Sequence, residues 1–450
     1  MYNSKETIVA ISTGATSSAI SIVRMSGDDA INIADQIFLS LNGALPSSFE
    51  TRKLVLGKLQ AQNFTEQAMC VVFAAPNSYT GEHIVEFQCH GGLKIATGIM
   101  QECIRLGARL ATNGEFTKRA FLNGKMSLSS AEGMMDMINA ESDAEIRAGY
   151  GLLTGNLSKL GTDAQAELTD ILAELEVSFD YPEETIEFIT KSKIKERLLK
   201  LNKEIEKTIA TSEAGKIIKS GINILIMGKP NVGKSSLLNT LLQKERAIVT
   251  DVAGTTRDSL EETFALGDFK VNLIDTAGIH DTDDKVEKIG VEKAKSYINF
   301  ADLILFLVDT SRDYSKEDEQ IFEQIKDKKY IVVKTKSDLE SKVNKSFDSE
   351  VSISNITNDG VEELKNKIIE TMKLENISSD GIVITNERHK NALTRAGESI
   401  TRALEALETE TLDLIAIDIK DAYQEIGEIT GNTTSEEIIN SIFDKFCLGK

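Results

Sequence analysis

The sequence predicts a multidomain fold in which an α+β unit is followed by an all-α helical unit, and an α/β unit is inserted into the helical one. Three observations predict it. Short β-branched runs recur up to about Lys125, apolar residues fall at helical spacing after Ser129 and again beyond Asn386, and a strand-like apolar run begins at Ile222. At ~100 to 200 residues per domain, 450 residues are enough for about three domains.

The composition is that of a globular protein, with 41% hydrophobic and 27% charged residues. Lys and Arg number 51 against 71 Asp and Glu, so the formal net charge is −20, which argues against a general nucleic-acid coat. The four cysteines form no CxxC pair, so we expect neither a disulfide framework nor a zinc site, and a reducing cytoplasm fits best. No apolar run approaches the ~20 residues of a membrane span, so we expect no span and no signal peptide.

In the first unit, the predicted strands are short and are separated by Gly, Asn and Pro. A helical pattern at residues 93–106 interrupts them. The predicted strands are residues 8–11, 19–23, 54–56, 69–73 and 84–87.

The helical unit begins with a capping box at Ser129 and Glu132 and continues to Pro182, which should end its long helix. A charged helix follows at residues 194–209. In the tail, apolar stripes predict helices that need partners, and a capping box at Thr434 and Glu437 should start the last one. The first stripe comprises Leu393, Ala396, Ile400, Ala403 and Leu407, and the second Leu412, Ile415, Ile419, Ala422 and Ile426.

The inserted unit opens with a strand at Ile222–Met227 that leads into a GxxxxGKS loop and a helix. In this setting the glycines let the loop backbone wrap a β-phosphate, Lys234 supplies positive charge, and Ser235 offers a hydroxyl to Mg²⁺. The loop residues expected to contact a nucleotide are Gly228, Asn231, Val232, Gly233, Lys234, Ser235 and Ser236.

Two further segments fit a switch that senses the γ-phosphate. A strand at residues 271–274 runs into a DxxG motif, and a polar stretch between the loop and that strand has a threonine able to complete Mg²⁺ coordination. The motif comprises Asp275, Thr276, Ala277 and Gly278. The polar stretch comprises Thr250, Asp251, Val252, Ala253, Gly254, Thr255 and Thr256.

The strand at residues 331–333 leads into Thr335, Lys336, Ser337 and Asp338, which resembles the NKxD guanine motif of GTPases. Asp338 should accept hydrogen bonds from guanine N1 and N2, a pair of donors that adenine lacks, while the Lys336 stem covers the base. Thr335 stands where Asn is usual, which affects the contact to the other edge of the purine.

Ser354, Asn355 and Ile356 follow a strand at residues 351–353. They resemble a degenerate last base-contacting loop, with an ordinary strand-to-helix turn as the alternative.

After Gly278 comes Ile279, where Ras-like GTPases carry the glutamine that orients the attacking water. An aliphatic side chain cannot hydrogen-bond water, so another group must activate it. Acidic candidates for this role lie downstream, and a solvated acidic loop is the alternative reading. They are Asp281, Asp283, Asp284 and Glu287.

The motifs at the two ends of the chain add a resemblance over essentially its full length. The chain closes with Phe446, Cys447, Leu448, Gly449 and Lys450, and its first unit contains Thr80-Gly81-Glu82, Glu86 to Gly92, Gly114-Glu115-Phe116 and Ala120 to Lys125. Together with a GTPase unit inserted into a helical one, these motifs resemble the MnmE (TrmE) family of tRNA modification GTPases.

The resemblance implies a folate-binding-like dimerisation domain at residues 1–125, a helical domain at 126–215 and 377–450, and a Ras-like P-loop GTPase domain at 216–376. It implies a homodimer that forms a heterotetramer with the flavoprotein MnmG. With GTP, Mg²⁺, K⁺ and 5,10-methylene- or 5-formyl-tetrahydrofolate, the two proteins would install an aminomethyl or carboxymethylaminomethyl group at carbon 5 of the wobble uridine of certain tRNAs.

The resemblance also implies roles for single residues. Ser235 and Thr256 would hold Mg²⁺, Glu287 would activate water, and Lys234 would support catalysis. The implied K⁺ site comprises Asn231, Thr250, Val252 and Thr255, and the implied folate site comprises Arg24, Glu86, Lys125 and Lys450.

Two other functions remain open at this point: a regulatory GTPase of ribosome assembly, and a stand-alone one-carbon transferase regulated by GTP. The absence of a GxxG-bearing RNA-binding appendage and the closing motif argue against the first. One basic stretch in this acidic chain would touch tRNA or MnmG, or else be a solvated helix face. It comprises Lys191, Lys193, Lys195, Arg197, Lys200 and Lys203.

Overall fold

The structure is a computed structural model that describes residues 6–14, 16–180, 184–244, 261–275, 296–374, 381–409 and 412–450. Its contacts divide the chain into two compact units, which are treated separately below. The first unit comprises Met1–Met135, Leu152–Asn202 and Arg395–Lys450, and the second comprises Asp136–Gly151 and Lys203–Thr394.

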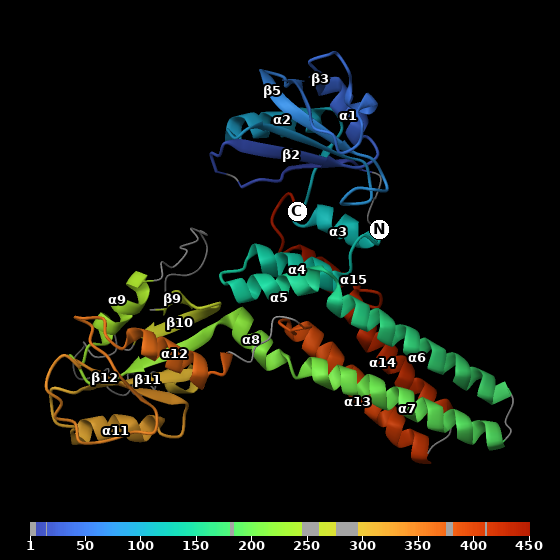
Figure 1. Cartoon of the computed structure of the whole chain (residues 1–450). Coiled ribbons are helices and arrows are strands. Elements are labelled where there is room, and N and C mark those ends of the chain that lie inside the picture. The colour runs from blue at the N-terminus through green and yellow to red at the C-terminus, as the bar shows by residue number, and fades with distance from the viewer. Residues whose placement is uncertain are drawn as a thin grey trace, which may run out of the picture. The chain divides into compact units, whose positions relative to one another are not determined.

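The first unit contains a seven-stranded sheet in the order β3-β4-β5-β6-β2-β1-β7, in which only the β1–β7 pair is parallel. The strands are β1 (Ile8–Ile11), β2 (Ile20–Ser26), β3 (Phe38–Ser40), β4 (Val55–Gln60), β5 (Thr65–Phe73), β6 (Ile84–His90) and β7 (Arg109–Leu110). Helices α1 (Ala30–Ile37) and α2 (Leu93–Arg105) pack on this sheet, with Ile33 and Ile99 in one core with Val23 and Phe87 (Figure 1). The alternation of buried and exposed residues along β4 explains why one face of the sheet meets these helices.

Two short helices join this sheet to the rest of the unit: α3 (Glu115–Leu122) and, from the end of the chain, α15 (Glu436–Phe443). Phe121 of α3 packs against Phe443 of α15, with ring centroids 6.0 Å apart. The first and last segments of the chain therefore share a small aromatic core, to which Leu128 of α4 (Leu128–Ile138) contributes.

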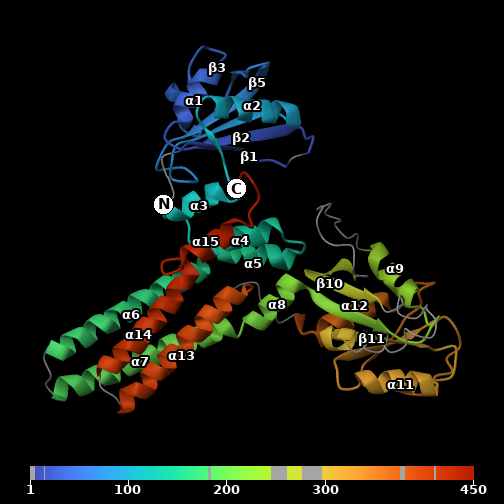
Figure 2. The same ribbon diagram turned by 180° about the vertical axis from the view of Figure 1, so that it is seen from behind.

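Four long helices run side by side in both views (Figures 1 and 2). They are α6 (Asn156–Asp180), α7 (Glu184–Ile209), α13 (Glu387–Thr409) and α14 (Leu412–Thr430). Both predicted apolar stripes of the tail are buried, apart from Leu412, whose side chain lies outside the described residues. Helix α6 is described as far as Asp180, and Pro182, which was predicted to end it, lies outside the described residues, so that stop remains a prediction.

The two predicted capping boxes are each misplaced. Helix α4 starts at Leu128, and the Ser127 hydroxyl, not that of Ser129, accepts from the Ser130 amide at 3.1 Å. Helix α15 is capped by Ser435, which accepts from the Ile438 amide, whereas Thr434 donates to the Glu428 carbonyl. Each helix start contains several Ser or Thr residues close together, and more than one of them fits the capping pattern. The sequence pattern alone therefore could not identify which residue caps the helix.

The second unit holds a six-stranded sheet in the order β13-β12-β11-β8-β10-β9, parallel except for the edge strand β9. The strands are β8 (Ile222–Met227), β9 (Glu261–Leu266), β10 (Phe269–Asp275), β11 (Leu303–Asp309), β12 (Tyr330–Thr335) and β13 (Glu350–Ser352). Near-continuous burial along β11 is typical of a parallel strand covered on both faces.

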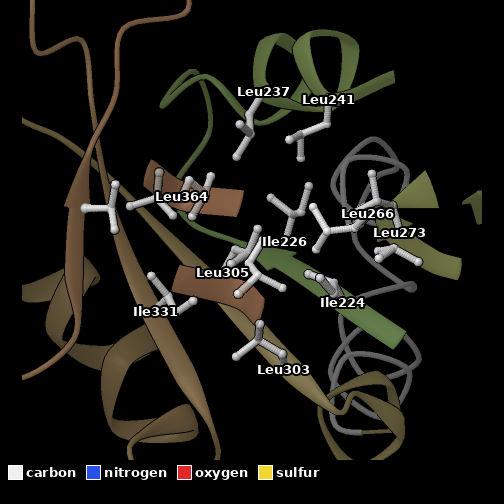
Figure 3. Packing of buried hydrophobic residues seen from close by; sticks show 14 of the residues in the cluster. Ile224, Ile226, Leu237, Leu241, Leu266, Leu273, Leu303, Leu305, Ile331 and Leu364 are labelled. Carbon is white, nitrogen blue, oxygen red and sulfur yellow. The ribbon is translucent and has the colours of Figure 1, made fainter. Parts of the chain in front are cut away.

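Helices α9 (Lys234–Lys244), α11 (Lys316–Ile325) and α12 (Val361–Thr371) cover this sheet. Leu237 and Leu241 of α9 lie over Ile226 of β8 in one cluster (Figure 3). A second cluster, with Ile325 of α11 and Phe306 of β11, forms the other core of the sheet. The chain passes from β8 to β10 on one side and to β11 on the other, which makes the carboxyl end of β8 a switch point where α/β sheets bind ligands.

Helices α5 (Asp143–Leu153) and α8 (Ser212–Ser220) also belong to this unit over most of their length. The Ala144 amide donates to the Asp268 carbonyl at 3.1 Å, and Arg147 pairs with the Asp268 carboxylate at 2.6 Å. Helix α5 is thereby fixed to the turn of the β9–β10 hairpin. Nowhere in the described ranges is a helix both long and apolar enough to cross a membrane.

Candidate functional site

The GxxxxGKS loop lies between β8 and α9, as predicted. Gly228 has φ +153°, and a Cβ on it would lie 2.6 Å from the Leu307 carbonyl oxygen, so only glycine fits where the loop crosses β11. Gly233 has φ +104° and Asn231 has φ 62°, so the loop turns through the left-handed region at both positions. These turns form a tight loop that ends at the first residue of α9, the geometry that presents backbone amides to an anion.

Lys234 lies inside this loop. Its side chain is only 8% exposed, and its Nζ donates to the Gly228 carbonyl at 2.9 Å. Ser235 follows in the first turn of α9 with an exposed side chain. The loop therefore holds a buried ammonium group beside an accessible hydroxyl, which suits a phosphate with its metal ion.

The predicted switch residues cannot be placed with the loop. Thr250 to Thr256, Thr276 to Gly278, Ile279, and the acidic candidates Asp281, Asp283, Asp284 and Glu287 all lie outside the described residues. Asp275 ends β10 next to β8, but its side chain is outside the described residues too.

The end of β12 approaches the same loop. Thr335 is fully buried, and its Oγ1 donates to the Val232 carbonyl at 2.7 Å and lies 3.3 Å from the Val308 carbonyl. Thus the residue that departs from the usual guanine motif ties β12 to the phosphate loop.

Lys336 follows Thr335 with φ 61°, and its Nζ pairs with Asp309 at 2.6 Å. Burial alone would raise the pKa of Asp309, but hydrogen bonds from Lys336 and Ser311 outweigh it and hold that pKa below its usual value. Asp309 therefore stays ionised and fixes the lysine whose stem is predicted to cover the base. Sequence reasoning missed Asp309, although its place at the carboxyl end of a buried strand was a usable signal.

Asp338 and Ser354 are brought together as the predicted base site requires. The Ser354 hydroxyl, on a residue 1% exposed, donates to Asp338 Oδ1 at 2.6 Å, and it accepts from the amides of Ile356 and Thr357. Ser337 is held beside this loop by a bond from its amide to the Ile353 carbonyl. The carboxylate is thus oriented by the loop after β13, while Ile356 points outward with 83% exposure.

A second candidate site lies in the first unit, where Arg24 of β2 and Glu86 of β6 are direct cross-strand neighbours. Arg24 Nε donates to Glu86 Oε1 at 2.7 Å, and the guanidinium lies 5.8 Å from the ring centroid of Tyr79 and 5.7 Å from that of Phe116. A cavity of about 450 Å³ opens here, lined by Arg24, Phe73, Tyr79, Ile84, Glu86, Met134 and Lys450. Its size is in the range of small-molecule pockets, and it joins one ion pair with an apolar wall.

Three of the four predicted folate residues therefore line one cavity, and the fourth, Lys125, is not among its lining residues. Sequence reasoning missed Tyr79, whose hydroxyl bonds to Thr117 at 2.8 Å. Burial raises the pKa of the Tyr79 phenol, partly offset by that hydrogen bond and by the charge of Arg24. The Tyr79 hydroxyl therefore stays protonated as a neutral group of the wall.

Lys450 reaches the cavity because the last residues are bound to the start of α3. The Phe116 amide donates to the Lys450 carbonyl at 3.2 Å, and the Ser12 hydroxyl donates to the Gly449 carbonyl at 3.1 Å. A Cβ on Gly449 would lie 2.4 Å from the Ile11 carbonyl oxygen, so glycine is required for this approach.

The helix that receives this segment is itself held by buried charges. Arg119 bridges Glu82 at 3.0 Å and Glu115 at 2.9 Å, and Arg109 bonds to Glu115 at 2.7 Å. Burial would raise the pKa of Glu115, but bonds from Arg109, Thr112 and Arg119 lower it to about 2. Glu115 is therefore ionised at neutral pH and anchors α3.

Two residues of the motifs at the ends of the chain, Cys447 and His90, are not among the residues that line the cavity. Cys447 is an exposed thiol, and His90 is an exposed side chain bonded to Glu66. Within the basic stretch, Arg197 pairs with Glu167 at 2.5 Å and with Glu174 at 2.8 Å, and Lys195 pairs with Glu408.

Comparisons with known proteins cover both units. The model of a family described as the MnmE helical domain matches residues 128–447, and that of the GTP-binding protein TrmE N-terminus matches residues 7–125. The tRNA modification GTPase MnmE of Clostridioides difficile (strain 630) is 42% identical over 455 residues, which cover 99% of this chain and 99% of that protein. The protein of the same name from Alkaliphilus metalliredigens (strain QYMF) is 41% identical over 457 residues, again at 99% of both.

Among solved structures, an Era variant of Aquifex aeolicus bound to GDP and aluminium fluoride is 29% identical. It matches with a TM-score of 0.27 and covers 39% of this chain and 66% of that chain.

Proposed function

The chain belongs to the MnmE family and is a GTP hydrolase that acts in tRNA modification. On this basis we propose the specific reaction that it takes part in. It installs an aminomethyl or carboxymethylaminomethyl group at carbon 5 of the wobble uridine of certain tRNAs. The proposed one-carbon donor is a tetrahydrofolate derivative, either 5,10-methylene or 5-formyl, and the proposed partner is the flavoprotein MnmG.

The observation that carries the nucleotide assignment is that the guanine motif and the phosphate loop meet. Thr335 is bonded to Val232 of the loop, and Asp338 is oriented by Ser354. Asp338 would accept from guanine N1 and N2, Lys336 would cover the base, and Lys234 would bind the β- and γ-phosphates. Asn355 Oδ1 is buried and, among the described residues, bonds to no partner, which supports a polar ligand at this place.

Mg²⁺ fits the donor set, because the exposed hydroxyl of Ser235 is a hard oxygen ligand at the mouth of the loop. We propose that Thr256 is the second protein ligand. When bound, Mg²⁺ neutralises charge on the phosphates, while the loop residues fix their position.

We further propose that K⁺ is held by Asn231, Thr250, Val252 and Thr255, and that Glu287 activates the attacking water. The support is that Ile279 removes the usual water-orienting side chain, and that Asn231 turns the loop at the phosphate end. Glu287→Ala should slow hydrolysis and leave GTP affinity nearly unchanged. Equal hydrolysis rates in Na⁺ and K⁺ buffers would count against the K⁺ site.

The cavity at Arg24 and Glu86 supports the proposed folate site. A reduced folate carries a pterin with amino and N3 donors and an anionic glutamate tail. Glu86 would accept from the pterin, Arg24 or Lys450 would meet a carbonyl or anionic group, and Tyr79 would cover an apolar face. Lys125 is retained as a candidate for the tail.

The proposed assembly is a cytoplasmic homodimer that joins MnmG in a heterotetramer and acts on tRNA. An apolar surface supports a second copy on the first unit. Leu56 and Met69 are cross-strand neighbours, each 39% exposed, and Leu39 on the adjacent strand is 48% exposed. A monomer by sedimentation at micromolar concentration would argue against the homodimer.

The nucleotide assignment is tested by Asp338→Asn. Replacing the carboxylate acceptor by an amide donor should weaken GTP binding by about 10- to 100-fold and favour xanthosine triphosphate, whose 2-oxo group accepts a hydrogen bond. The matched control is Asp359→Asn in the adjacent loop, which should leave the preference for GTP intact. If ATP displaces GTP from the unaltered chain as well as GDP does, the assignment is wrong.

A further inference from the structure

Thr335 lacks the chemistry of the asparagine that usually stands at its position. A hydroxyl has a single hydrogen to donate, whereas a side-chain amide carries a donor group and an acceptor. Here the hydroxyl lies 2.7 Å from the Val232 carbonyl and 3.3 Å from the Val308 carbonyl, in a fully buried position. Its hydrogen is therefore used to hold the phosphate loop, and none is left for a base.

A second side-chain amide lies beside the same loop. Asn355 Nδ2 is 3.3 Å from the position that a Cβ on Gly233 would take, and the Thr335 Cβ is 3.9 Å from that position. Thr335 ends β12 and Asn355 lies in the loop after β13, and the two residues thus flank one glycine of the phosphate loop. The Asn355 side chain therefore lies near Thr335, whose side chain is shorter than that of the asparagine usually found at this position.

The Asn355 amide is also incompletely bonded within the described part of the chain, where its Oδ1 is buried without a hydrogen-bond partner. Rotation of the amide by half a turn exchanges Oδ1 and Nδ2 and keeps the same shape. Either the oxygen or the NH₂ group of the amide can therefore face a ligand. Buried polar groups are almost always hydrogen-bonded, so this amide is expected to bind one.

We propose that Asn355 is a specificity-determining residue that donates from its side-chain amide to guanine N7, in place of the asparagine missing at Thr335. The choice of N7 follows from position. Asp338 takes the N1 and N2 edge, and N7 lies on the five-membered ring that carries the ribose and phosphates, on the side of the phosphate loop. The assignment rests on the proposed binding of GTP and refines it.

The test compares GDP with 7-deaza-GDP, which lacks the N7 acceptor, by titration calorimetry on the full chain. The unaltered chain should bind 7-deaza-GDP about 2- to 12-fold more weakly than GDP, the range of one neutral hydrogen bond. Asn355→Ala should weaken GDP by a similar factor and bring the ratio of the two dissociation constants close to unity. Asp359→Asn, an exposed side chain in the same loop, is the matched control and should keep the original ratio.

A second variant guards against misfolding of the first. Adding Thr335→Asn to Asn355→Ala restores an amide on the other side of Gly233 and should restore discrimination against 7-deaza-GDP. An unchanged ratio in Asn355→Ala, with GDP still bound, would overturn the role of Asn355 and leave the GTPase assignment standing. If the unaltered chain bound ATP as tightly as GTP, the proposed function itself would instead be overturned.

Discussion

The position of Lys450 shows how single backbone groups place a side chain in a site. The first amides of a helix lack partners within the helix, and here the start of α3 finds them in the last residues of the chain, with Phe116 bonded to the Lys450 carbonyl. Gly449 allows this approach to Ile11. The terminal residue is therefore held by its main chain, which leaves its side chain to line the cavity.

This arrangement separates the lysine side chain from the structural role of its backbone. Lys450→Ala and Arg24→Ala should each weaken binding of a reduced folate by about 1 to 3 kcal/mol, the value of a charged hydrogen bond. Deletion of residue 450 would also remove the carbonyl that Phe116 uses, so substitution is the cleaner change. Calorimetry with 5-formyl-tetrahydrofolate measures the effect.

Lys53→Ala provides the control, since Lys53 is an exposed member of a surface pair with Glu50. That variant should bind folate like the unaltered chain. If the unaltered chain itself gives no heat with the reduced folate, the cavity does not serve this ligand.

At the residue scale, the sequence predicted the glycine and charged residues of each site better than it predicted the residues that contact them. Gly228, Lys234 and Asp338 belong to motifs with fixed spacing, so their neighbourhood could be inferred from order along the chain. Asp309 and Tyr79 reach their sites through strand pairing and tertiary contact, which no local spacing encodes. The use of the Thr335 hydroxyl likewise depended on how closely two loops approach.

At the scale of elements, the β9–β10 hairpin contacts α5 and the segment just before this helix. Asp268 in the turn binds Arg147 and the Ala144 amide, and Lys270 of β10 binds Glu141 at 2.5 Å. The hairpin is continuous in sequence with residues 245–260 and 276–295, where the predicted switch motifs lie. We predict from this continuity that nucleotide binding at the switch motifs acts on the hairpin that contacts α5.

We predict that Arg147→Glu uncouples this contact at little cost in stability. The paired side chains are 41% and 52% exposed, so the pair should contribute no more than about 1 kcal/mol to the free energy of unfolding. GDP affinity should be unchanged, whereas GTP-dependent tRNA modification should fall. The measurements are thermal unfolding, GDP titration and wobble-uridine analysis of the product.

The reciprocal variant Arg147→Glu with Asp268→Arg restores the pair in reverse and should recover modification. Lys326→Glu is the control, because Lys326, which directly follows α11, pairs with Glu323 on that helix in an exposed position. Full modification by Arg147→Glu alone would exclude this pair from the coupling.

Elements with a strong apolar period were predictable, and those defined by packing were less so. The strand at Ile222–Met227 was predicted with its bounds, because an apolar run interrupted by Asn223 alone ends at a glycine. Helix α1 was not predicted, although its buried positions Ala30, Ile33, Ala34 and Ile37 have helical spacing. At only eight residues, α1 gives a short signal beside stronger strand patterns.

For the whole molecule, charge is the property that matters most for a tRNA substrate. The net charge of −20 disfavours binding of a polyanion such as tRNA. Within the most basic stretch, Lys195 and Arg197 form ion pairs with acidic residues of the same chain. A local site can still bind a nucleotide phosphate, as the glycine loop would, but an extended RNA needs positive charge over a larger area. The predicted domain ranges 1–125, 126–215, 216–376 and 377–450 remain predictions. The two compact units of the structure each combine separate stretches of sequence, so their bounds do not test these ranges.

The last prediction is that tRNA modification requires a second protein. Building a carbon substituent on a uridine from a one-carbon unit and an amine demands redox chemistry, which side chains alone do not supply and which usually falls to a cofactor such as a flavin. The sequence has no evident GxGxxG dinucleotide loop. We therefore expect wobble-uridine modification when tRNA, GTP, a reduced folate, glycine or ammonium and K⁺ are combined with this chain and MnmG, and none when either protein is omitted. Mass analysis of the tRNA nucleosides is the measurement, and the Asp338→Asn chain with xanthosine triphosphate in place of GTP is the control that ties the product to this nucleotide site. Modified uridine formed by this chain alone would overturn the two-protein reaction and favour a stand-alone transferase.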